Sequence, residues 1–440
     1  MRIPSILTVL FSVLPLSAQD PPLNLTPGLG DFNEGAAWSP DGRSIAFMSR
    51  SRSILNSRIY VVQADGSQRV QLTDGTRYDL NPVWSPDGTR IAFNSRLRDS
   101  RESRIYTMAP DGSQIRAIST PIDMGWHSTP AWSPDGTQMA FVVHTPNAAD
   151  IYVADVESGE IRQITSHPEI DEHPFWSPDG TLGFVSKREG GHGDLFRLLP
   201  SGDVENLTNH AARDVLWFFS TAGTNPWSPD GKWILFSSDR DSAIGSGDVY
   251  ILGVDDGSVR RLTFSRLTEF RFTWAPDSRR IAYDYADEQG RDDLYVLDIE
   301  SGGLTRVTDE DYRGQRPVWS PDGTRLAYVS FSDQRSDIYV MSADRAVESL
   351  VPDPNLVTLD GDVRISSAAD LEELLSRGGD AFEIFGTLSI RNTDLVDLTA
   401  LRGLKGIQGG NLRIQGNGSL VSLEGLEGIT KLNELQIISN

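Results

Sequence analysis

The chain of 440 residues contains no cysteine. This absence excludes disulfide bonds, thiolate metal ligands, a thiol nucleophile and a lipid-anchoring cysteine together. Lysine is also scarce, so arginine supplies 36 of the 40 cationic side chains, and the four lysines are Lys187, Lys232, Lys405 and Lys431. The formal net charge of −22 makes nucleic acids and anionic membranes poor partners.

Long apolar runs are missing beyond the N-terminus. Arg2, the apolar run Ile3 to Leu16 and the small residues near Ala18 predict a secretory signal peptide over residues 1–19. The run is too short to span a membrane as a helix, and no later stretch is apolar for 18 residues. We therefore expect a soluble periplasmic or extracellular protein without membrane insertion.

The motifs of common enzyme classes are missing as well. The chain has no G-x-S-x-G of a serine hydrolase, no P-loop, no H-E-x-x-H, no dinucleotide fingerprint and no EF-hand loop. The six histidines show no metal-binding spacing along the chain, although propeller loops that are distant in sequence can converge. The sequence therefore argues against a serine hydrolase and predicts no catalytic residue, metal ion or cofactor.

The chain does contain a repeated pentapeptide, Trp-Ser-Pro-Asp-Gly. Its tryptophans are 46, 48, 44, 51, 47 and 45 residues apart, at Trp38, Trp84, Trp132, Trp176, Trp227, Trp274 and Trp319, and at Trp274 the motif reads Trp-Ala-Pro-Asp-Ser. Each is followed by a triplet of the Ile-Ala-Phe type and a triplet of the Ile-Tyr-Val type, and all but the last by a pair of the Leu-Thr type. These short β-branched and aromatic runs between turn residues predict strands, and four strands per unit is the size of a propeller blade.

The pentapeptide predicts a tight turn, because Pro fixes φ, Asp bonds the local backbone and Gly accepts φ > 0. The Trp can bury about 150–250 Å² as a wedge between neighbouring blades. The seventh unit has Arg345 where the others have a second turn glycine, and its last strand ends at Leu350 without the Leu-Thr pair. That pair occurs at Leu25-Thr26, so we expect the strand Leu23 to Thr26 to complete the last blade.

These features predict an all-β fold with a seven-bladed propeller over residues 22–350, or six blades if a terminal unit is incomplete. The four recurring motifs closely resemble TolB-type, WD-like propeller repeats, which occur in the periplasmic Tol system protein and in prolyl-oligopeptidase-like enzymes. The resemblance covers roughly three quarters of the chain and implies the fold only. TolB itself differs by an α/β domain before its propeller and by having fewer blades than the seven counted.

Beyond a predicted linker at residues 351–357 the period changes. Strands of the x-Leu-x-Ile type begin 25, 24 and 23 residues apart, at Val363, Leu388, Leu412 and Leu435. This spacing predicts a leucine-rich solenoid over residues 358–440, which resembles the receptor L-domain type. Ser367 is a helix cap for residues 368–377. Because the last strand is apolar and uncapped, we expect a truncated sequence, or else a partner that covers the open edge.

Function is expected on the face that carries the loops between second and third strands and the links between blades, because these segments vary. The ring positions, three residues before each Trp, lie at the expected mouth of the central channel and are Gly35, Asn81, Thr129, His173, Thr224, Arg271 and Arg316. Arg271 and Arg316 suit a carboxylate or sugar anion. His127 and His173 suit acid–base chemistry or metal binding. Equally, residues at strand ends are often polar because they border solvent.

The link between the fourth and fifth units is longer than the others and contains Trp217, Phe218 and Phe219 in succession. These aromatic side chains would form either a lip that stacks a sugar or peptide, or additional core. We predict an exported, non-enzymatic binding or scaffold protein with protein or glycan partners on the variable face. The alternatives are a carbohydrate-active enzyme, resembling oligogalacturonate lyases with their histidine-held metal, and a Tol-type envelope protein.

Overall fold

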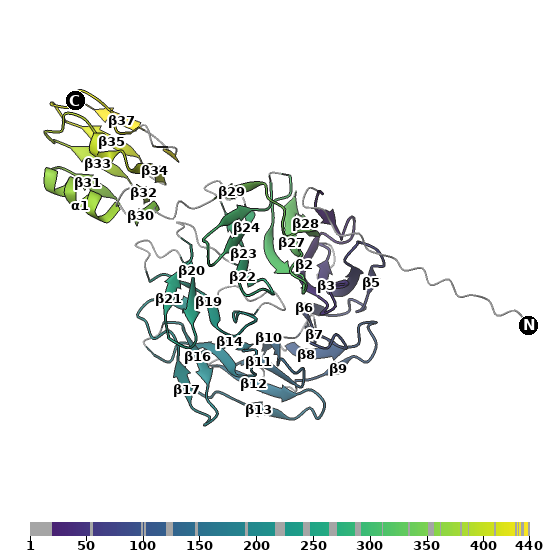
Figure 1. The fold of residues 1–440 in the computed structure, drawn as a ribbon. Coiled ribbons are helices and arrows are strands. Elements are labelled where there is room, and N and C mark those ends of the chain that lie inside the picture. Colours follow the sequence, from purple (N-terminus) through teal and green to yellow (C-terminus); the bar gives the residue numbers. More distant parts are fainter. Residues whose placement is uncertain are drawn as a thin grey trace, which may run out of the picture.

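The computed structural model describes residues 20–438 with short internal gaps. The gaps are residues 53–55, 98–99, 101–102, 120–125, 146–147, 190–191, 216–224, 241–246, 264–270, 287–291, 310, 333–334, 351–355, 361, 379–380, 386, 409–410, 427–428, 430 and 433–434. The predicted signal peptide lies outside the described residues. Within them the chain is mostly strands, arranged as a ring of sheets followed by a C-terminal pair of sheets (Figure 1).

Five sheets of the ring are separate antiparallel meanders whose strand order follows the sequence, because short turns join consecutive strands. They are β6 (Tyr78–Trp84), β7 (Ile91–Arg96), β8 (Ser103–Met108) and β9 (Arg116–Ala117); β10 (Trp126–Trp132), β11 (Gln138–His144), β12 (Ala149–Asp155) and β13 (Ile161–Gln163); β14 (Asp171–Trp176), β15 (Leu182–Ser186), β16 (Asp194–Leu198) and β17 (Val204–Asn206); β18 (Asp214–Val215), β19 (Trp233–Ser238), β20 (Asp248–Gly253) and β21 (Val259–Arg261); and β22 (Arg271–Trp274), β23 (Arg280–Ala286), β24 (Asp292–Asp298) and β25 (Leu304–Arg306), to which β29 (Glu348–Leu350) adds a fifth strand.

The first and last repeat units share one eight-stranded sheet. It consists of β2 (Phe32–Trp38), β3 (Ser44–Arg50), β4 (Ser57–Gln63) and β5 (Val70–Gln71) together with β26 (Gln315–Trp319), β27 (Arg325–Ser332), β28 (Arg335–Ser342) and β1 (Leu23–Asn24). A parallel bridge between Phe32 and Ser336 joins the two halves. The structure therefore has five separate blades rather than the predicted seven or six, because hydrogen bonds between β2 and β28 merge the units at the two ends of the propeller.

The pentapeptide forms the turn that its sequence predicts. In the first unit the Gly42 N–H donates to the Ser39 carbonyl (2.8 Å), while the Ser39 hydroxyl donates to Asp41 (2.6 Å) and accepts from the Ser44 N–H (2.9 Å). Gly42 has a φ of +68°, a conformation that favours glycine. The same Ser–Asp hydrogen bond recurs at Ser85, Ser133, Ser177, Ser228 and Ser320. These serines and aspartates therefore stabilise the turns formed by the pentapeptides.

The tryptophans lie between neighbouring units, as predicted. The Trp84 indole N–H donates to the Ala37 carbonyl (3.2 Å), and that of Trp38 donates to the Val318 carbonyl (3.1 Å). In each case the acceptor is the residue before the Trp of the preceding unit. Trp132, Trp176 and Trp274 repeat the contact. Because Trp38 makes it with the last unit, the same wedge that joins sequence neighbours also closes the ring.

The N-terminal strand completes the last unit, which confirms the closure predicted from the displaced Leu-Thr pair. Strand β1 pairs with β28, and the Leu25 N–H donates to the Ile338 carbonyl (2.8 Å). The Thr26 hydroxyl donates to Asp337 (2.7 Å) and accepts from the Ile338 N–H (3.0 Å). The chain that follows β28 leaves this unit, since β29 pairs with β25 of the neighbouring sheet. This is why the last unit lacks its own fourth strand in sequence order.

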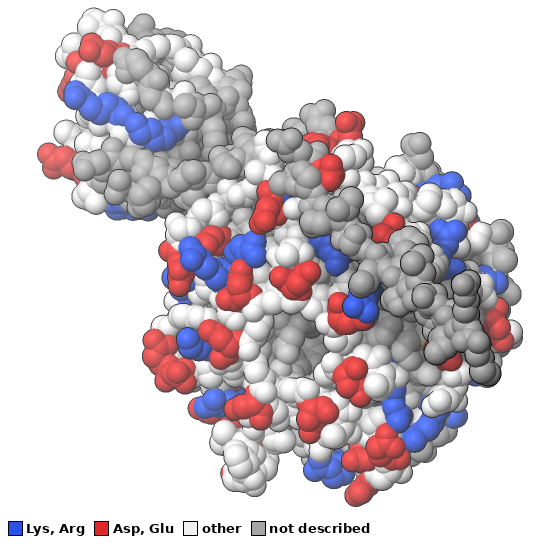
Figure 2. Space-filling view, turned by 45° about the vertical axis from the view of Figure 1, so that its right-hand side comes forward, with Lys and Arg blue, Asp and Glu red and all other residues white. Residues whose placement is uncertain are grey.

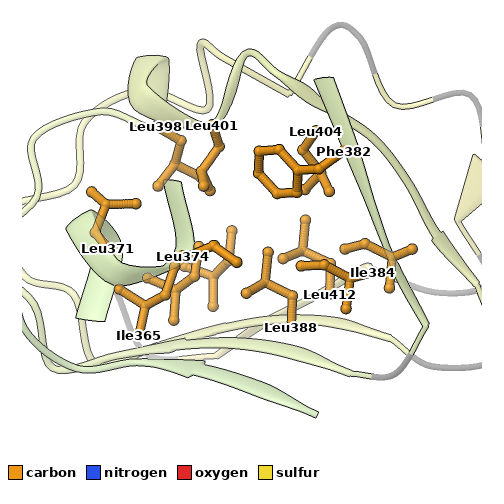
Figure 3. Close-up of a cluster of buried hydrophobic side chains, with 13 residues drawn as sticks. Ile365, Leu371, Leu374, Phe382, Ile384, Leu388, Leu398, Leu401, Leu404 and Leu412 are labelled. Atoms are coloured by element: carbon orange, nitrogen blue, oxygen red, sulfur yellow. The ribbon is translucent and has the colours of Figure 1, made fainter. Parts of the chain in front are cut away.

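The C-terminal region contains two parallel four-stranded sheets. One has β31 (Val363–Ile365), β33 (Leu388–Arg391), β35 (Leu412–Gln415) and β37 (Leu435–Ile438), and the other has β30 (Leu356–Asp360), β32 (Ala381–Phe385), β34 (Leu404–Gln408) and β36 (Lys431–Leu432). The first set begins at the four predicted positions. The second set is a correction, because the sequence returns were not predicted to be strands, and β30 begins inside the predicted linker. Figure 3 shows the apolar side chains packed between the sheets.

A helix, α1 (Ala368–Gly378), lies within one residue of its predicted bounds, and a 3-10 helix spans Thr399–Leu401. The Ser367 hydroxyl accepts from the Asp370 N–H (3.2 Å), which is the expected N-cap. Leu371 and Leu374 of this helix contribute to the C-terminal core. Across the described ranges, no helix has the length and apolar character needed to cross a membrane.

Candidate functional site

The first strands of the units lie around the middle of the ring (Figure 1) and carry a backbone irregularity at the ring positions. In β6 the pairing with β7 shifts between Leu80 and Val83, and equivalent shifts occur in β2, β10, β14 and β26. Four ring residues have positive φ, and these are Gly35 (+68°), Asn81 (+52°), His173 (+52°) and Arg316 (+58°). Positive φ is uncommon for residues other than glycine, so the fold holds these residues in a fixed, strained bulge.

Some of the predicted site residues lie close together, and others lie outside the described residues. Arg271 and Arg316 meet on neighbouring units, whereas Asn81 and His173 lie on units apart from them. Thr129 and His127 lie on β10, but their side chains are outside the described residues. Thr224, Trp217 and Phe218 also lie outside the described residues.

The described residues on either side of the long link belong to the fifth unit. Asp214 pairs with Ser238 in the register that Asp171 has with Ser186, and Trp227 forms a bridge with Ile234. Residues 216–224, which lie between these two pairings, are outside the described residues.

Arg271 and Arg316 converge on Asp284. One Arg271 guanidinium nitrogen, Nη1, lies 3.1 Å from Asp284 Oδ2 and 2.7 Å from Gln315 Oε1. The Arg316 backbone N–H donates to the same Asp284 oxygen (3.2 Å), and its Nη1 lies 2.6 Å from Glu34 Oε2. That these arginines grip an anion stays a prediction, and the structure shows the carboxylate partners that they already have. Both guanidinium groups already bind carboxylates.

Asp284 is the residue of this cluster that sequence reasoning missed. Its carboxyl is almost fully buried, and burial raises its pKa above the usual value while Arg271 opposes that rise. Among the described residues, Asp284 Oδ1 has no hydrogen-bond partner. A signal was present in the sequence, since Asp284 alone is charged at the position after the Ile-Ala-Phe type triplet.

A second cluster joins the third and fourth units through His144 at the end of β11. His144 Nδ1 lies 3.8 Å from Glu172 Oε1. Desolvation lowers the pKa of His173 to about 4, and desolvation together with the neighbouring His173 lowers the pKa of His144 to about 4. Burial raises the pKa of Glu172. At neutral pH both imidazoles are therefore uncharged and able to accept a hydrogen bond.

We expect His173→Asn to flatten the pH dependence of the free energy of unfolding between pH 6.5 and about 4. The unfolded imidazole binds its proton near pH 6.5 and the folded one only near pH 4, so stability falls as pH falls through this window. Asn removes this proton and tolerates the positive φ. One proton corresponds to a slope difference of up to about 1.4 kcal/mol per pH unit.

Urea unfolding at several pH values measures that slope, with His192→Asn as the control, because His192 is exposed. Burial raises the pKa values of Asp79 and Asp214, so these groups change the free energy of unfolding with pH in the direction opposite to His173. The quantity to compare is therefore the difference in slope between wild type and each variant. Equal slopes for wild type and His173→Asn would contradict the assignment.

The propeller surface is mixed in charge, and Figure 2 shows acidic and basic side chains interspersed around a hollow near the middle of the ring. No group of three or more His, Cys, Asp or Glu side chains is arranged to hold a metal ion in the part of the chain that the structure describes. The described side chains of the histidine cluster in the third and fourth units therefore do not form a set of three metal ligands.

Comparison with known families agrees with the repeat. The family described as TolB beta propeller domain matches residues 28–124 and 122–225, which supports a TolB-type propeller domain in this part of the chain. An uncharacterized peptidase of Bacillus subtilis (strain 168), YuxL, is 29% identical over 146 residues, a match covering 24% of this chain and 21% of that protein. An uncharacterized protein of Agrobacterium fabrum is 27% identical over 137 residues, covering 31% and 42%. The chain thus spans less than half the length of these curated relatives.

Solved structures resemble the chain at the level of fold. An oligogalacturonate lyase in complex with manganese has a TM-score of 0.59 at 17% identity, covering 72% of this chain and 92% of that one. An oligogalacturonate lyase of Vibrio parahaemolyticus has a TM-score of 0.57 at 17% identity, covering 75% and 93%. A prolyl endopeptidase has a TM-score of 0.53 at 11% identity, covering 85% and 74%. At these identities the likeness concerns the propeller fold alone.

Proposed function

We propose that the protein is an exported binding or scaffold protein that receives a protein or glycan partner at the ring positions. The observation that carries the proposal is the cluster around Asp284, where two arginines from neighbouring units meet a buried carboxylate and Arg316 lies at a strand bulge. Buried polar groups are normally fully hydrogen-bonded, so the unpartnered Oδ1 of Asp284 favours a ligand hydroxyl or amide at this place.

The domain organisation that accompanies this function is also a proposal. Residues 1–19 would direct export to the periplasm, where TolB-type propeller proteins typically act. Residues 22–350 would form one propeller domain, built from the sheets of the ring. Residues 358–440 would be a leucine-rich solenoid of the receptor L-domain type, supported by its paired parallel sheets.

Asp284→Asn tests the proposed site. Wild type and variant, each immobilised, are exposed to an oligosaccharide array and to an extract of cell-envelope proteins. We expect the variant to lose about tenfold in affinity for the captured partner, because a ligand donor then loses its charged acceptor. The matched control is Asp309→Asn, whose carboxylate pairs with Arg345 (2.7 Å) away from the ring positions. A partner that binds both variants as tightly as wild type would place the interaction elsewhere.

A carbohydrate-active enzyme is the second candidate, favoured by the two neutral imidazoles of His144 and His173 beside Glu172. The described residues do not gather a metal-ligand set there, so no metal-dependent step is derived. Metal analysis of the purified protein decides between the candidates. A stoichiometric divalent ion that is lost in His127→Ala or His173→Ala would favour the enzyme, and capture of an envelope lipoprotein would favour a Tol-type role.

A further inference from the structure

The sheet of β31, β33, β35 and β37 has one face buried in the C-terminal core and the other face on the outside. Its alternate residues Ile365, Leu388, Ile390, Leu412 and Ile414 belong to the C-terminal core. Because successive side chains of a strand point to opposite faces, the residues between them lie on the outer face. The outer face therefore carries Arg364, Ser389, Arg391, Arg413, Gln415, Gln436 and Ile438, and we call it the arginine face.

The register aligns the arginines of this face. Arg364 pairs with Ser389, which pairs with Arg413, which pairs with Gln436, so these residues form one row across the strands. Two strand spacings place the backbones of Arg364 and Arg413 roughly 10 Å apart. Arg391 lies two residues further along β33, beside Gln415 of the next strand. In Figure 2 a row of basic side chains is visible on the C-terminal sheets, at the upper left.

No acidic side chain belongs to any of these four strands. Within the described part of the chain, Arg364, Arg391 and Arg413 have no ion pair or side-chain hydrogen bond, and the Nε atoms of Arg391 and Arg413 are buried without a partner. This contrasts with the propeller, where Arg188, Arg240, Arg271 and Arg316 each bind a carboxylate. In a chain of net charge −22, the exposed Arg364 and the half-buried Arg391 and Arg413 form a cationic site on strands without acids.

We propose that the arginine face binds an acidic polysaccharide, a linear chain that carries carboxylate groups. Guanidinium groups recognise carboxylates through paired N–H donors, and the serine and glutamine side chains between them suit sugar hydroxyls. A protein interface of ordinary size has an apolar core with aromatic anchors. The rows of this face contain no aromatic residue, and Ile438 on the edge strand β37 is their one apolar residue, which favours a hydrophilic polyanion over an acidic protein. The site does not depend on the function proposed for the propeller.

The full-length protein with Arg364→Gln, Arg391→Gln and Arg413→Gln tests the proposal, with alginate as the probe. We expect wild type to bind alginate at low ionic strength, to bind more weakly as salt shortens the Debye length, and not to bind neutral dextran. The triple variant should lose about tenfold in affinity, as expected when three solvent-accessible charge pairs with the ligand are removed. Its thermal unfolding should match wild type, because the changed side chains lie outside the core.

The matched control is a triple variant of three exposed propeller arginines, Arg43→Gln, Arg69→Gln and Arg162→Gln, which makes the same change in net charge. A loss below twofold in this control, with the tenfold loss in the first variant, supports the site. Equal losses in both variants, no binding of alginate by wild type, or equal binding of dextran would each overturn it. Tighter binding of poly-glutamate than of alginate would also overturn it and assign the face to an acidic protein.

Discussion

Replacing Asp171 by Ala is expected to lower the free energy of unfolding by about 3–5 kcal/mol. Asp171 is fully buried, and one guanidinium nitrogen of Arg188 lies 2.9 and 3.0 Å from its two carboxylate oxygens. The Arg188 guanidinium also lies over the rings of Phe184 and Phe196, at 5.3 and 5.0 Å from their centroids. Removing the carboxylate leaves this cation largely desolvated without its counter-charge, which costs far more than the pair itself contributes.

The same sheet provides the control. Arg197 and Glu205 form a pair at 2.6 Å whose side chains both remain partly accessible to solvent, so Glu205→Ala should cost at most about 1 kcal/mol. The double variant Asp171→Ala with Arg188→Met should recover most of the stability, because no charge then remains buried. Urea unfolding followed by tryptophan fluorescence measures all three. If Asp171→Ala costs no more than Glu205→Ala, the buried pair is not a major stabilising contact.

Replacing Leu25 by Ala is expected to lower the free energy of unfolding of the propeller by about 2–5 kcal/mol. Leu25 is 1% exposed and packs with Ile338 and Val340 of the last unit and with Phe47 of the first. Its contacts therefore join the two ends of the ring, and a cavity at this place weakens the closure as well as the local core. Thr26→Val should add a loss of about 1–3 kcal/mol, because the Ile338 N–H and Asp337 lose their common partner.

The control for the closure is Leu97→Ala, since Leu97 is 52% exposed and should change stability by less than about 0.5 kcal/mol. The unfolding transition should be followed by the fluorescence of the tryptophans, which lie in every unit. A Leu25→Ala variant that unfolds at the same urea concentration as Leu97→Ala would show that the N-terminal strand is not needed to close the ring.

Much of the propeller was predictable because the residues that determine its turns and strands are close in sequence and recur from unit to unit. Ser39, Pro40, Asp41 and Gly42 specify a turn from within four residues, so the six copies of this pattern and its variant after Trp274 give turns wherever the units end up. The displacement of Leu25-Thr26 to the N-terminus also predicted the closing strand. The number of separate blades was not predictable, because it depends on whether β2 and β28, far apart in sequence, form hydrogen bonds with each other.

The candidate site was predicted only in part. The ring positions were found because their residue types vary while the rest of the repeat recurs, whereas the bulge that Asn81, His173 and Arg316 share was not predicted. That Arg271 and Arg316 are already paired was not visible, because their partners Asp284 and Glu34 come from other strands and another unit. The alignment of Arg364 and Arg413 likewise follows from parallel register rather than from sequence spacing alone.

By itself the sequence determined the strand type, the turns, the tryptophan wedge and the positions of the four Leu-x-Ile strands, because each depends on neighbouring residues or on a fixed period. Only the tertiary structure decided which charges meet, which stay unpaired and which units merge. Those outcomes depend on distances between side chains from separate strands, and burial changes the free energy of a charge far more than its place in the sequence does.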